Sequence, residues 1–281
     1  MKKGLILEGG AMRGLFTAGI CDVMMKNGIE FDGMIGVSAG AAFGCNYKSG
    51  QIGRVLRYNL KYARDRRYCS LHSLVTTGDL YSAAFCYHEI PEKLDIFDVE
   101  AFISNPMEYY VVCTDIVTGE PVYRKCDTVD YNNLEWIRAS ASMPLVSRIV
   151  EVDGYELLDG GIADSVPLKY FESIGYDRNV VVLTQPATYI KGENKAMPLV
   201  RRRLKKYPGV IKAMENRHIM YNNTIKEICE KEKKGEILVL RPEAPLPVGR
   251  VERNPERLQA TYDVGRKVGE HNLERIKEYL R

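Results

Sequence analysis

A serine with a glycine two positions away on each side lies near the start of the chain, in Gly36-Val37-Ser38-Ala39-Gly40. A short apolar segment precedes it and a run of small residues follows, so the pattern predicts a strand, a sharp turn and a helix start. Small residues let the strand and helix approach closely and leave the serine hydroxyl exposed, as in a nucleophile elbow. Ser38 is therefore a candidate nucleophile, although the same pentapeptide also suits a plain turn.

A glycine-rich loop lies earlier in the chain, after an apolar segment at 4–7. Its residues are Gly9, Gly10, Ala11, Met12, Arg13 and Gly14. Such a loop can direct successive backbone N–H groups toward an anion. A nucleotide-phosphate loop is one interpretation, but the dinucleotide glycine pattern is broken and no Lys-Ser/Thr pair follows. An oxyanion hole is another, in which each N–H stabilises the charge formed during attack by Ser38 by roughly 3 to 4 kcal/mol. A glycine-rich connection that binds nothing is the third.

A nucleophilic serine needs a base, and a carboxylate is the best candidate. An apolar segment leads into Asp159-Gly160-Gly161, so Asp159 is predicted at a strand end, where glycines permit a tight turn. The Ser-His-Asp hydrolase fold places several strands before its elbow, whereas only one strand-helix unit fits before Ser38. The four histidines fall in an irregular segment or in predicted surface helices: His72, His88, His218 and His271. Asp-Gly-Gly is also a common structural turn.

Strand-like and helix-like segments alternate along the chain and must position these residues. Apolar segments predict strands buried on both faces at 4–7, 31–37, 108–116, 179–184 and 236–242. Helical spacing occurs at 210–228 and at 254–280, which begins with an Asn-Pro cap. Residues 122–126 and 147–161 predict antiparallel additions, the second turning at Asp153-Gly154. The fold class is therefore α/β, with a mainly parallel central sheet flanked by helices.

Composition limits the function classes. The chain has 281 residues and 45% hydrophobic content, which suits a single domain over 1–281. A formal charge of +3 is too balanced to indicate a nucleic-acid partner. The seven cysteines form no C-x-x-C pair, so neither a metal site nor a disulfide framework is indicated, and no cofactor is expected. Without a signal-peptide core or an apolar span of about 20 residues, the expected location is the cytoplasm.

Two basic segments, 57–68 and 201–207, contain interleaved Tyr and Leu. Such runs are usual for a solvated face, but they also suit a lipid-facing surface. Near an anionic membrane, each cationic side chain contributes roughly 1 kcal/mol of binding free energy. The second run contains five of them: Arg201, Arg202, Arg203, Lys205 and Lys206. They lead to the expectation of peripheral contact with the inner membrane face. The irregular stretch 65–105 is a candidate lid over the site, and its Tyr81 and Tyr87 also suit a core.

The three motifs taken together, in this order, resemble the patatin-like phospholipase family. Further matches are ASASMP at 139–144 and VVCTDIVTGEPVYR at 111–124, which look like a bacterial branch of the family. The resemblance covers about 4–185 and is weaker over 186–281. It implies a three-layer fold in which the C-terminal strand and helices pack on the motif-bearing part.

The resemblance also implies a serine hydrolase with a Ser-Asp dyad, in which Ser38 is the nucleophile and Asp159 the base. Arg13 would steady the loop whose backbone amides form the oxyanion hole: Gly10, Ala11 and Met12. Family members usually carry a third glycine where Ala11 stands. The implied substrate is a lipid or another lipophilic ester, cleaved through an acyl-enzyme, with acyl transfer also compatible. Because the ordinary pKa of aspartate is about 3.9, the dyad must be buried for Asp159 to act near neutrality. The alternatives are a non-catalytic or nucleotide-binding regulator on the same scaffold, and a Ser-His-Asp esterase.

Overall fold

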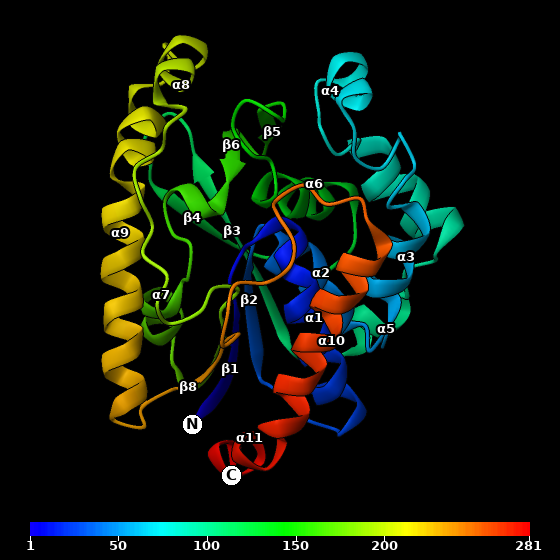
Figure 1. Ribbon diagram of the computed structural model, residues 1–281, viewed down its shortest axis with the longest axis vertical. Helices are drawn as coiled ribbons and strands as arrows, with labels where there is room; N and C mark the ends of the chain where they lie inside the picture. The colour runs from blue at the N-terminus through cyan, green and yellow to red at the C-terminus, as the bar shows by residue number, and fades with distance from the viewer.

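The computed structural model describes all 281 residues and contains a central sheet of eight strands. Five neighbouring strands run parallel, in the order β3, β2, β1, β7 and β8 (Figure 1). Their bounds are β1 Lys2–Leu7, β2 Gly33–Val37, β3 Glu108–Asp115, β7 Tyr176–Val182 and β8 Leu238–Leu240. Each overlaps a predicted strand, so the prediction of a mainly parallel α/β sheet is confirmed.

Three short strands extend the sheet antiparallel: β4 Pro121–Lys125, β5 Val150–Val152 and β6 Tyr155–Asp159. At Cys113, β3 pairs with β4 and with β6, and at Val112 it pairs with β4 and with the end of β2. Strands β2 and β6 therefore lie on the same side of β3, with their ends facing. This register brings the residue after β2 next to the last residue of β6, which is Asp159.

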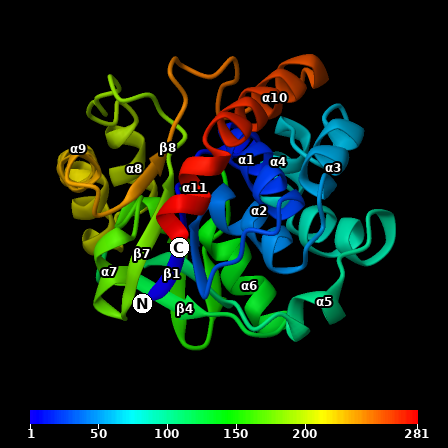
Figure 2. The ribbon, with the colours of Figure 1, turned by 90° about the horizontal axis from the view of Figure 1, so that it is seen from below.

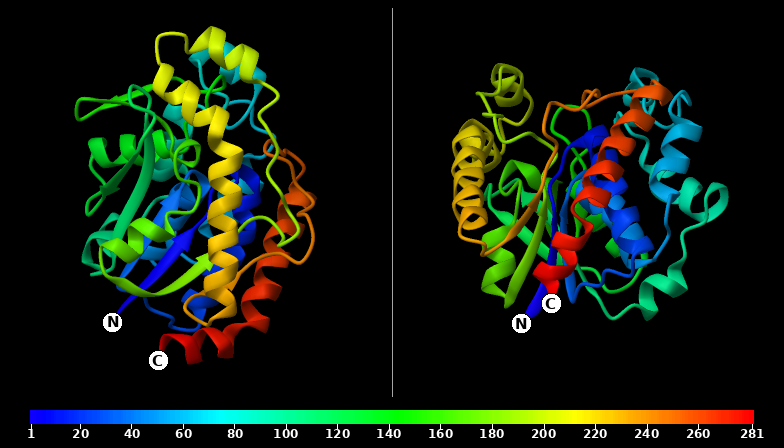
Figure 3. Two further views of the ribbon diagram at one scale, coloured as in Figure 1. Left: turned by 90° about the vertical axis from the view of Figure 1, so that its left-hand side faces the viewer. Right: turned by 60° about the horizontal axis from the view of Figure 1, so that its bottom comes forward.

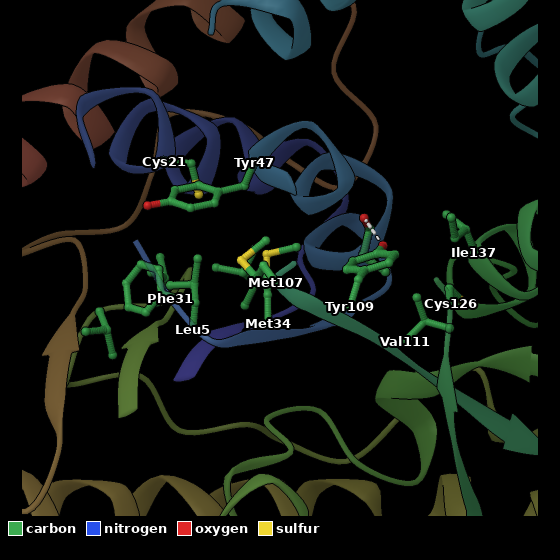
Figure 4. Close-up of a cluster of buried hydrophobic side chains, with 14 of the residues drawn as sticks. Leu5, Cys21, Phe31, Met34, Tyr47, Met107, Tyr109, Val111, Cys126 and Ile137 are labelled. Atoms are coloured by element: carbon green, nitrogen blue, oxygen red, sulfur yellow. Dashed lines mark hydrogen bonds between the residues drawn. The ribbon is translucent and has the colours of Figure 1, made fainter. Parts of the chain in front are cut away.

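Helices cover both faces of the sheet and give the predicted three layers (Figure 2). One layer contains α1 Gly14–Lys26, α2 Ala39–Lys48, α6 Tyr131–Ser140 and α10 Pro255–His271, and the other contains α7 Leu168–Ser173 and α9 Pro208–Lys233. Alternate residues of β1 face the two helix layers. Leu5 packs in the core cluster with α1 and α2, and Ile6 packs in the cluster with α7 and α9. Figure 4 shows Leu5 and Met34 facing Cys21 and Tyr47. The strands are thus buried on both faces, as their continuous apolar runs predict.

The C-terminal residues pack on this framework. Strand β8 pairs with β7, and α10 crosses α1 so closely that a Cβ on Gly19 would lie 2.3 Å from the carbonyl oxygen of Tyr262. The single helix predicted over 254–280 is wrong in one respect, because the chain turns at Asn272 and continues as α11 Leu273–Leu280. The turn lets Ile276 and Leu280 join the core cluster that contains Leu5 and Ile20, which helical spacing alone does not reveal. Helix α11 lies at the end of the molecule where both termini lie (Figure 3). That 1–281 forms a single domain stays a prediction.

The remaining helices lie toward the carboxyl ends of the parallel strands or beside α1 and α2. They are α3 Arg54–Tyr62, α4 Leu71–Thr77, a π-helical segment Phe85–Leu94, α5 Val99–Ser104 and α8 Met197–Arg203. In Figures 1 and 3, α4 and α8 lie at the same end of the molecule. No helix combines the length and the apolar character that crossing a bilayer requires.

Candidate active site

Ser38 occupies a sharp turn between β2 and α2. Its backbone has φ 55° and ψ −121°, a conformation that non-glycine residues rarely adopt and that active sites often contain. The flanking glycines are required by close approach, because a Cβ on Gly36 would lie 2.5 Å from the carbonyl oxygen of Gly40, and a Cβ on Gly40 would lie 2.3 Å from that of Leu7. This is the strand-turn-helix geometry of a nucleophile elbow.

The structure brings Ser38 and Asp159 together although they are far apart in the sequence. The Ser38 Oγ donates a hydrogen bond to Asp159 Oδ2 at 2.6 Å, and both side chains are buried. The second carboxylate oxygen of Asp159 accepts from the N–H of Gly161 at 2.8 Å. Gly160 packs so closely on β3 that an added Cβ would lie 2.0 Å from the Val112 carbonyl oxygen. The Asp159 carboxylate is therefore fixed by the turn that follows it and by the serine.

Burial raises the pKa of Asp159 above the ordinary aspartate value, while the positive charge of Arg217 and the hydrogen bonds from Ser38 and Gly161 oppose that rise. The net direction is upward, because desolvation of the charged form is the largest effect. A carboxylate with a raised pKa is a stronger base, so this environment suits proton transfer from a serine hydroxyl near neutral pH.

The glycine-rich loop packs directly against the serine, since a Cβ on Gly9 would lie 2.9 Å from Ser38 Cβ. Within the protein, no acceptor takes a hydrogen bond from the loop amides of Gly9, Gly10, Ala11 and Met12. Ala11 has φ 49°, a strained value that glycine would adopt freely. The loop thus presents unpaired N–H groups beside the hydroxyl, which is what an oxyanion hole requires.

Hydrogen bonds fix the residue that precedes the loop, whereas the Arg13 side chain forms none. The preceding residue, Glu8, is buried, and its carboxylate accepts hydrogen bonds from Thr184 Oγ1 at 3.0 Å and from the Tyr221 hydroxyl at 2.7 Å. The Arg13 side chain, expected to steady the loop, forms no hydrogen bond, and its Nε is buried without a partner. Gly14 begins α1 and packs against Phe43.

Two residues that sequence reasoning did not assign form hydrogen bonds to the dyad or to the turn that follows it. Ser140, the last residue of α6, is fully buried; its Oγ accepts from the Ser38 N–H at 2.9 Å and donates to the Val112 carbonyl oxygen at 2.6 Å. Arg217 on α9 donates from Nε to the Gly161 carbonyl oxygen. Ser140 lies within the ASASMP segment, so a signal existed for it, whereas Arg217 lies in an ordinary amphipathic helix.

None of the four histidines forms a hydrogen bond with Ser38 or Asp159. His88 pairs with Glu92 at 3.2 Å, and His218 lies on α9 in the wall of a chamber beside the site. The geometry therefore favours a dyad over a Ser-His-Asp triad. No three side chains of the metal-binding types come together, and all seven cysteines are free thiols.

Two cavities meet at Ser38 and Ala11. The first has a volume of about 250 Å³, and 20 of its 24 lining residues are hydrophobic, among them Phe43, Tyr58 and Phe102. Residues of the irregular stretch, including Tyr81 and Tyr87, form much of its wall. That stretch therefore borders the site, and its opening as a lid stays a prediction. The second cavity has a volume of about 600 Å³ and is lined by many polar and cationic side chains.

Curated proteins and solved structures resemble this chain to different extents. An uncharacterized protein, YjjU from Escherichia coli, is 25% identical over 98% of this chain and 78% of its own length. Lysophospholipase nte1 from Aspergillus terreus is 27% identical over 62% of this chain, which spans only 11% of that longer protein. The crystal structure of VipD from Legionella pneumophila aligns with a TM-score of 0.46 and 12% identity over 97% of this chain and 67% of its own, too weak a likeness to support an argument.

Family models divide the chain into two matched regions. The model of a domain of unknown function matches residues 207–281. The model described as patatin-like phospholipase matches residues 5–172, a range that includes Ser38, Asp159 and the glycine-rich loop. At the level of the family, this match supports lipid hydrolysis. Because that match covers more than half of its residues, the chain belongs to the patatin-like phospholipase family.

Proposed function

We propose that the protein is a serine hydrolase that cleaves carboxylic esters of lipids, with Ser38 as nucleophile and Asp159 as base. The observation that carries the proposal is the buried 2.6 Å hydrogen bond from Ser38 Oγ to Asp159 Oδ2, at the point where an apolar cavity meets a loop of unpaired amides. A nucleotide-binding regulator on the same scaffold would need neither the hydrogen bond nor the apolar cavity.

The first half of the reaction forms an acyl-enzyme. Ser38 Oγ attacks the ester carbonyl carbon while its proton passes to Asp159 Oδ2. The carbonyl oxygen becomes an oxyanion that accepts hydrogen bonds from the amides of Gly10 and Ala11, with Met12 completing the hole. Collapse of this intermediate breaks the bond to the alcohol, whose oxygen takes the proton from Asp159.

The second half reverses these proton transfers with water as the attacking group. Asp159, again ionised, accepts a proton from a water molecule whose oxygen attacks the acyl carbon. The new oxyanion uses the same amides, and its collapse releases the fatty acid and returns the proton to Ser38 Oγ. An acyl acceptor other than water would give acyl transfer by the same steps.

The apolar cavity supports an acyl chain as the part of the substrate next to Ser38. Its aromatic walls come from α2, α3 and the stretch 65–105, and burying an alkyl chain there contributes about 0.8 kcal/mol per CH₂ group. Hydrophobic binding of this kind is non-directional and scales with the apolar area buried, so it selects lipophilic esters as a class.

A lipid surface is the partner that the exposed residues favour. The cations of 201–206 are all exposed, on or directly after α8. At the same end of the molecule, α4 exposes Leu71 and Val75, which are 75% and 85% accessible (Figures 1 and 3). Cations and exposed apolar side chains at one end of the molecule match an anionic membrane surface, which would place the cavity near its substrate.

The proposal is tested by labelling and turnover together. A fluorophosphonate probe should label the wild-type protein once, with the adduct on Ser38 by mass spectrometry, and Ser38→Ala should abolish both labelling and hydrolysis of a soluble ester. Ser173→Ala, which alters an exposed serine on α7, is the control and should retain both. Full activity in a folded Ser38→Ala protein would refute the proposal.

A further inference from the structure

The second cavity at Ser38 is a chamber in which cationic side chains outnumber carboxylates. Its walls carry five cationic side chains: Arg13, Lys191, Lys195, Arg217 and Arg250. They also carry the three carboxylates of Glu8, Asp159 and Glu193. Glu8 accepts hydrogen bonds from Thr184 and Tyr221, and Asp159 accepts one from Ser38. Five cations against three carboxylates leave the chamber walls with an excess of two positive charges.

The four cations nearest the site form no ion pair in the protein: Arg13, Lys191, Arg217 and Arg250. The Arg13 Nε is buried without any hydrogen-bond partner. Burial lowers the pKa of Lys191 to about 8; the repulsion of Arg217, Arg250 and Arg13 adds to that effect, and the negative charge of Glu8 opposes it. Unpaired, mutually repelling cations in a cavity are costly unless an anion joins them.

The chamber walls are held in place by specific contacts. The N–H and carbonyl oxygen of Lys191 both bond the Asn222 side chain on α9, at 2.9 and 3.0 Å. The Lys191 Nζ lies 4.1 Å from the centroid of the Tyr221 ring, which sets the direction of its side chain. Arg217 is fixed by its hydrogen bond to the Gly161 carbonyl oxygen. Lys191 and Arg217 are thus positioned before any ligand arrives.

We propose that this chamber binds the phosphate of an anionic headgroup, and that its excess positive charge repels the ammonium group of a zwitterionic one, so that the protein prefers lipid esters with a net negative headgroup. The inference rests on the proposed function for the acyl chain and the scissile ester, which occupy the apolar cavity and the Ser38 junction. Arginine and lysine side chains are the groups that bind phosphate oxygens most strongly.

The placement of the cations also gives the C-terminal region a role. Lys191, Arg217 and Arg250 all lie outside residues 5–172, and the last two lie within the region matched by the model of unknown function. That region would supply headgroup selection to a catalytic centre that the rest of the chain builds.

Binding is measured without turnover, in the Ser38→Ala protein. Calorimetry should detect saturable binding of sn-glycerol 3-phosphate and none of glycerol. Lys191→Gln and Arg250→Gln should each weaken that binding by about tenfold, the scale of one hydrogen bond to a charged group. The matched control is Lys212→Gln, which removes one exposed lysine from the outside of α9 and should bind normally. Absence of phosphate binding, or equal affinity in all three variants, would overturn the proposal.

Selectivity is measured with two lysolipids that share one acyl chain. The wild-type kcat/KM should be about tenfold higher or more for lysophosphatidylglycerol than for lysophosphatidylcholine, and Lys191→Gln should bring the ratio toward one. A ratio of one together with tight glycerol 3-phosphate binding would show a free-phosphate site instead and overturn the headgroup assignment. Failure to hydrolyse even a neutral soluble ester would refute the proposed hydrolase function, while the binding experiment still decides the anion site.

Discussion

Replacing Ser140 with alanine should weaken both the fold and the reaction. Its hydroxyl is fully buried, accepts from the Ser38 N–H and donates to the Val112 carbonyl oxygen. The alanine variant leaves these two backbone groups buried without partners. Each unsatisfied group costs about 1 to 3 kcal/mol, so the loss should be about 2 to 6 kcal/mol of unfolding free energy. A typical domain has a free energy of unfolding of about 5 to 15 kcal/mol, so much of the Ser140→Ala protein should remain folded.

The effect on the reaction follows from the strained backbone of Ser38, at φ 55° and ψ −121°. With its N–H released, the turn can relax, and a displacement of about 1 Å at a nucleophile can lower the rate by about a hundredfold. Turnover should therefore fall through kcat, with little change in KM, because the apolar cavity is not altered. The rate of fluorophosphonate labelling should fall in parallel.

Urea unfolding followed by circular dichroism measures the first effect, and kinetics on a soluble ester measures the second. Ser142→Ala is the matched control, because the Ser142 hydroxyl donates only to the carbonyl oxygen of Arg138, which also accepts from a backbone N–H. A Ser140→Ala protein with the unfolding midpoint and labelling rate of Ser142→Ala would refute the reasoning.

Four further predictions follow from burial, charge and close packing. Because burial raises the pKa of Asp159, kcat/KM should fall as the pH drops through that raised value, giving an acid limb above about 4; a limb at or below 4 would contradict this. Because its pKa is raised, the Asp159 carboxyl stays protonated to a higher pH in the folded protein than in the unfolded chain. The melting temperature of the wild-type protein, relative to that of Asp159→Asn, should therefore fall as the pH rises from about 4 through the folded-state pKa. Replacing the five cations at 201–206 with acidic residues should weaken binding to anionic vesicles in low salt and spare hydrolysis of a soluble ester. Unchanged binding would show that the segment is only a solvated face. Gly40→Ala should destabilise the protein by about 1 to 3 kcal/mol in urea unfolding, because its Cβ would overlap the Leu7 carbonyl oxygen, and Gly192→Ala, which faces open space, should not; equal stability of the two would refute the packing argument.

The elements that the sequence predicts well are those whose signal is local. The five parallel strands are continuous apolar runs. The turn at Ser38 is marked in the sequence by Gly36 and Gly40, which neighbouring backbone approaches too closely for a Cβ to fit. The antiparallel hairpin at 147–161 likewise turns at Asp153-Gly154, as expected. Each of these patterns is set by neighbours within a few residues, so periodicity and turn chemistry are sufficient.

The parts that the sequence does not predict depend on contacts between distant segments. Ser140 and Arg217 reach the dyad and its turn only because α6 and α9 pack beside β6 and the residues after it. The ASASMP segment marks Ser140, but no local pattern marks Arg217. The break at Asn272 lets the last helix reach the core cluster that contains Leu5 and Ile20. Lys191 lies in a loop whose position is fixed by Asn222, 31 residues away. The positions of Ser140, Arg217 and Lys191 and the break at Asn272 are therefore all set by tertiary packing.

The central claim, that Asp159 alone is the base for Ser38, is tested most directly by one comparison of kcat/KM on a soluble ester. Asp159→Asn keeps the shape of the side chain but cannot accept the proton, so it should lose nearly all activity while circular dichroism shows a folded protein. Glutamine in place of His72, His88, His218 or His271, one at a time, should leave most activity, because none of them bonds either member of the dyad. A folded histidine variant as inactive as Asp159→Asn would contradict the account.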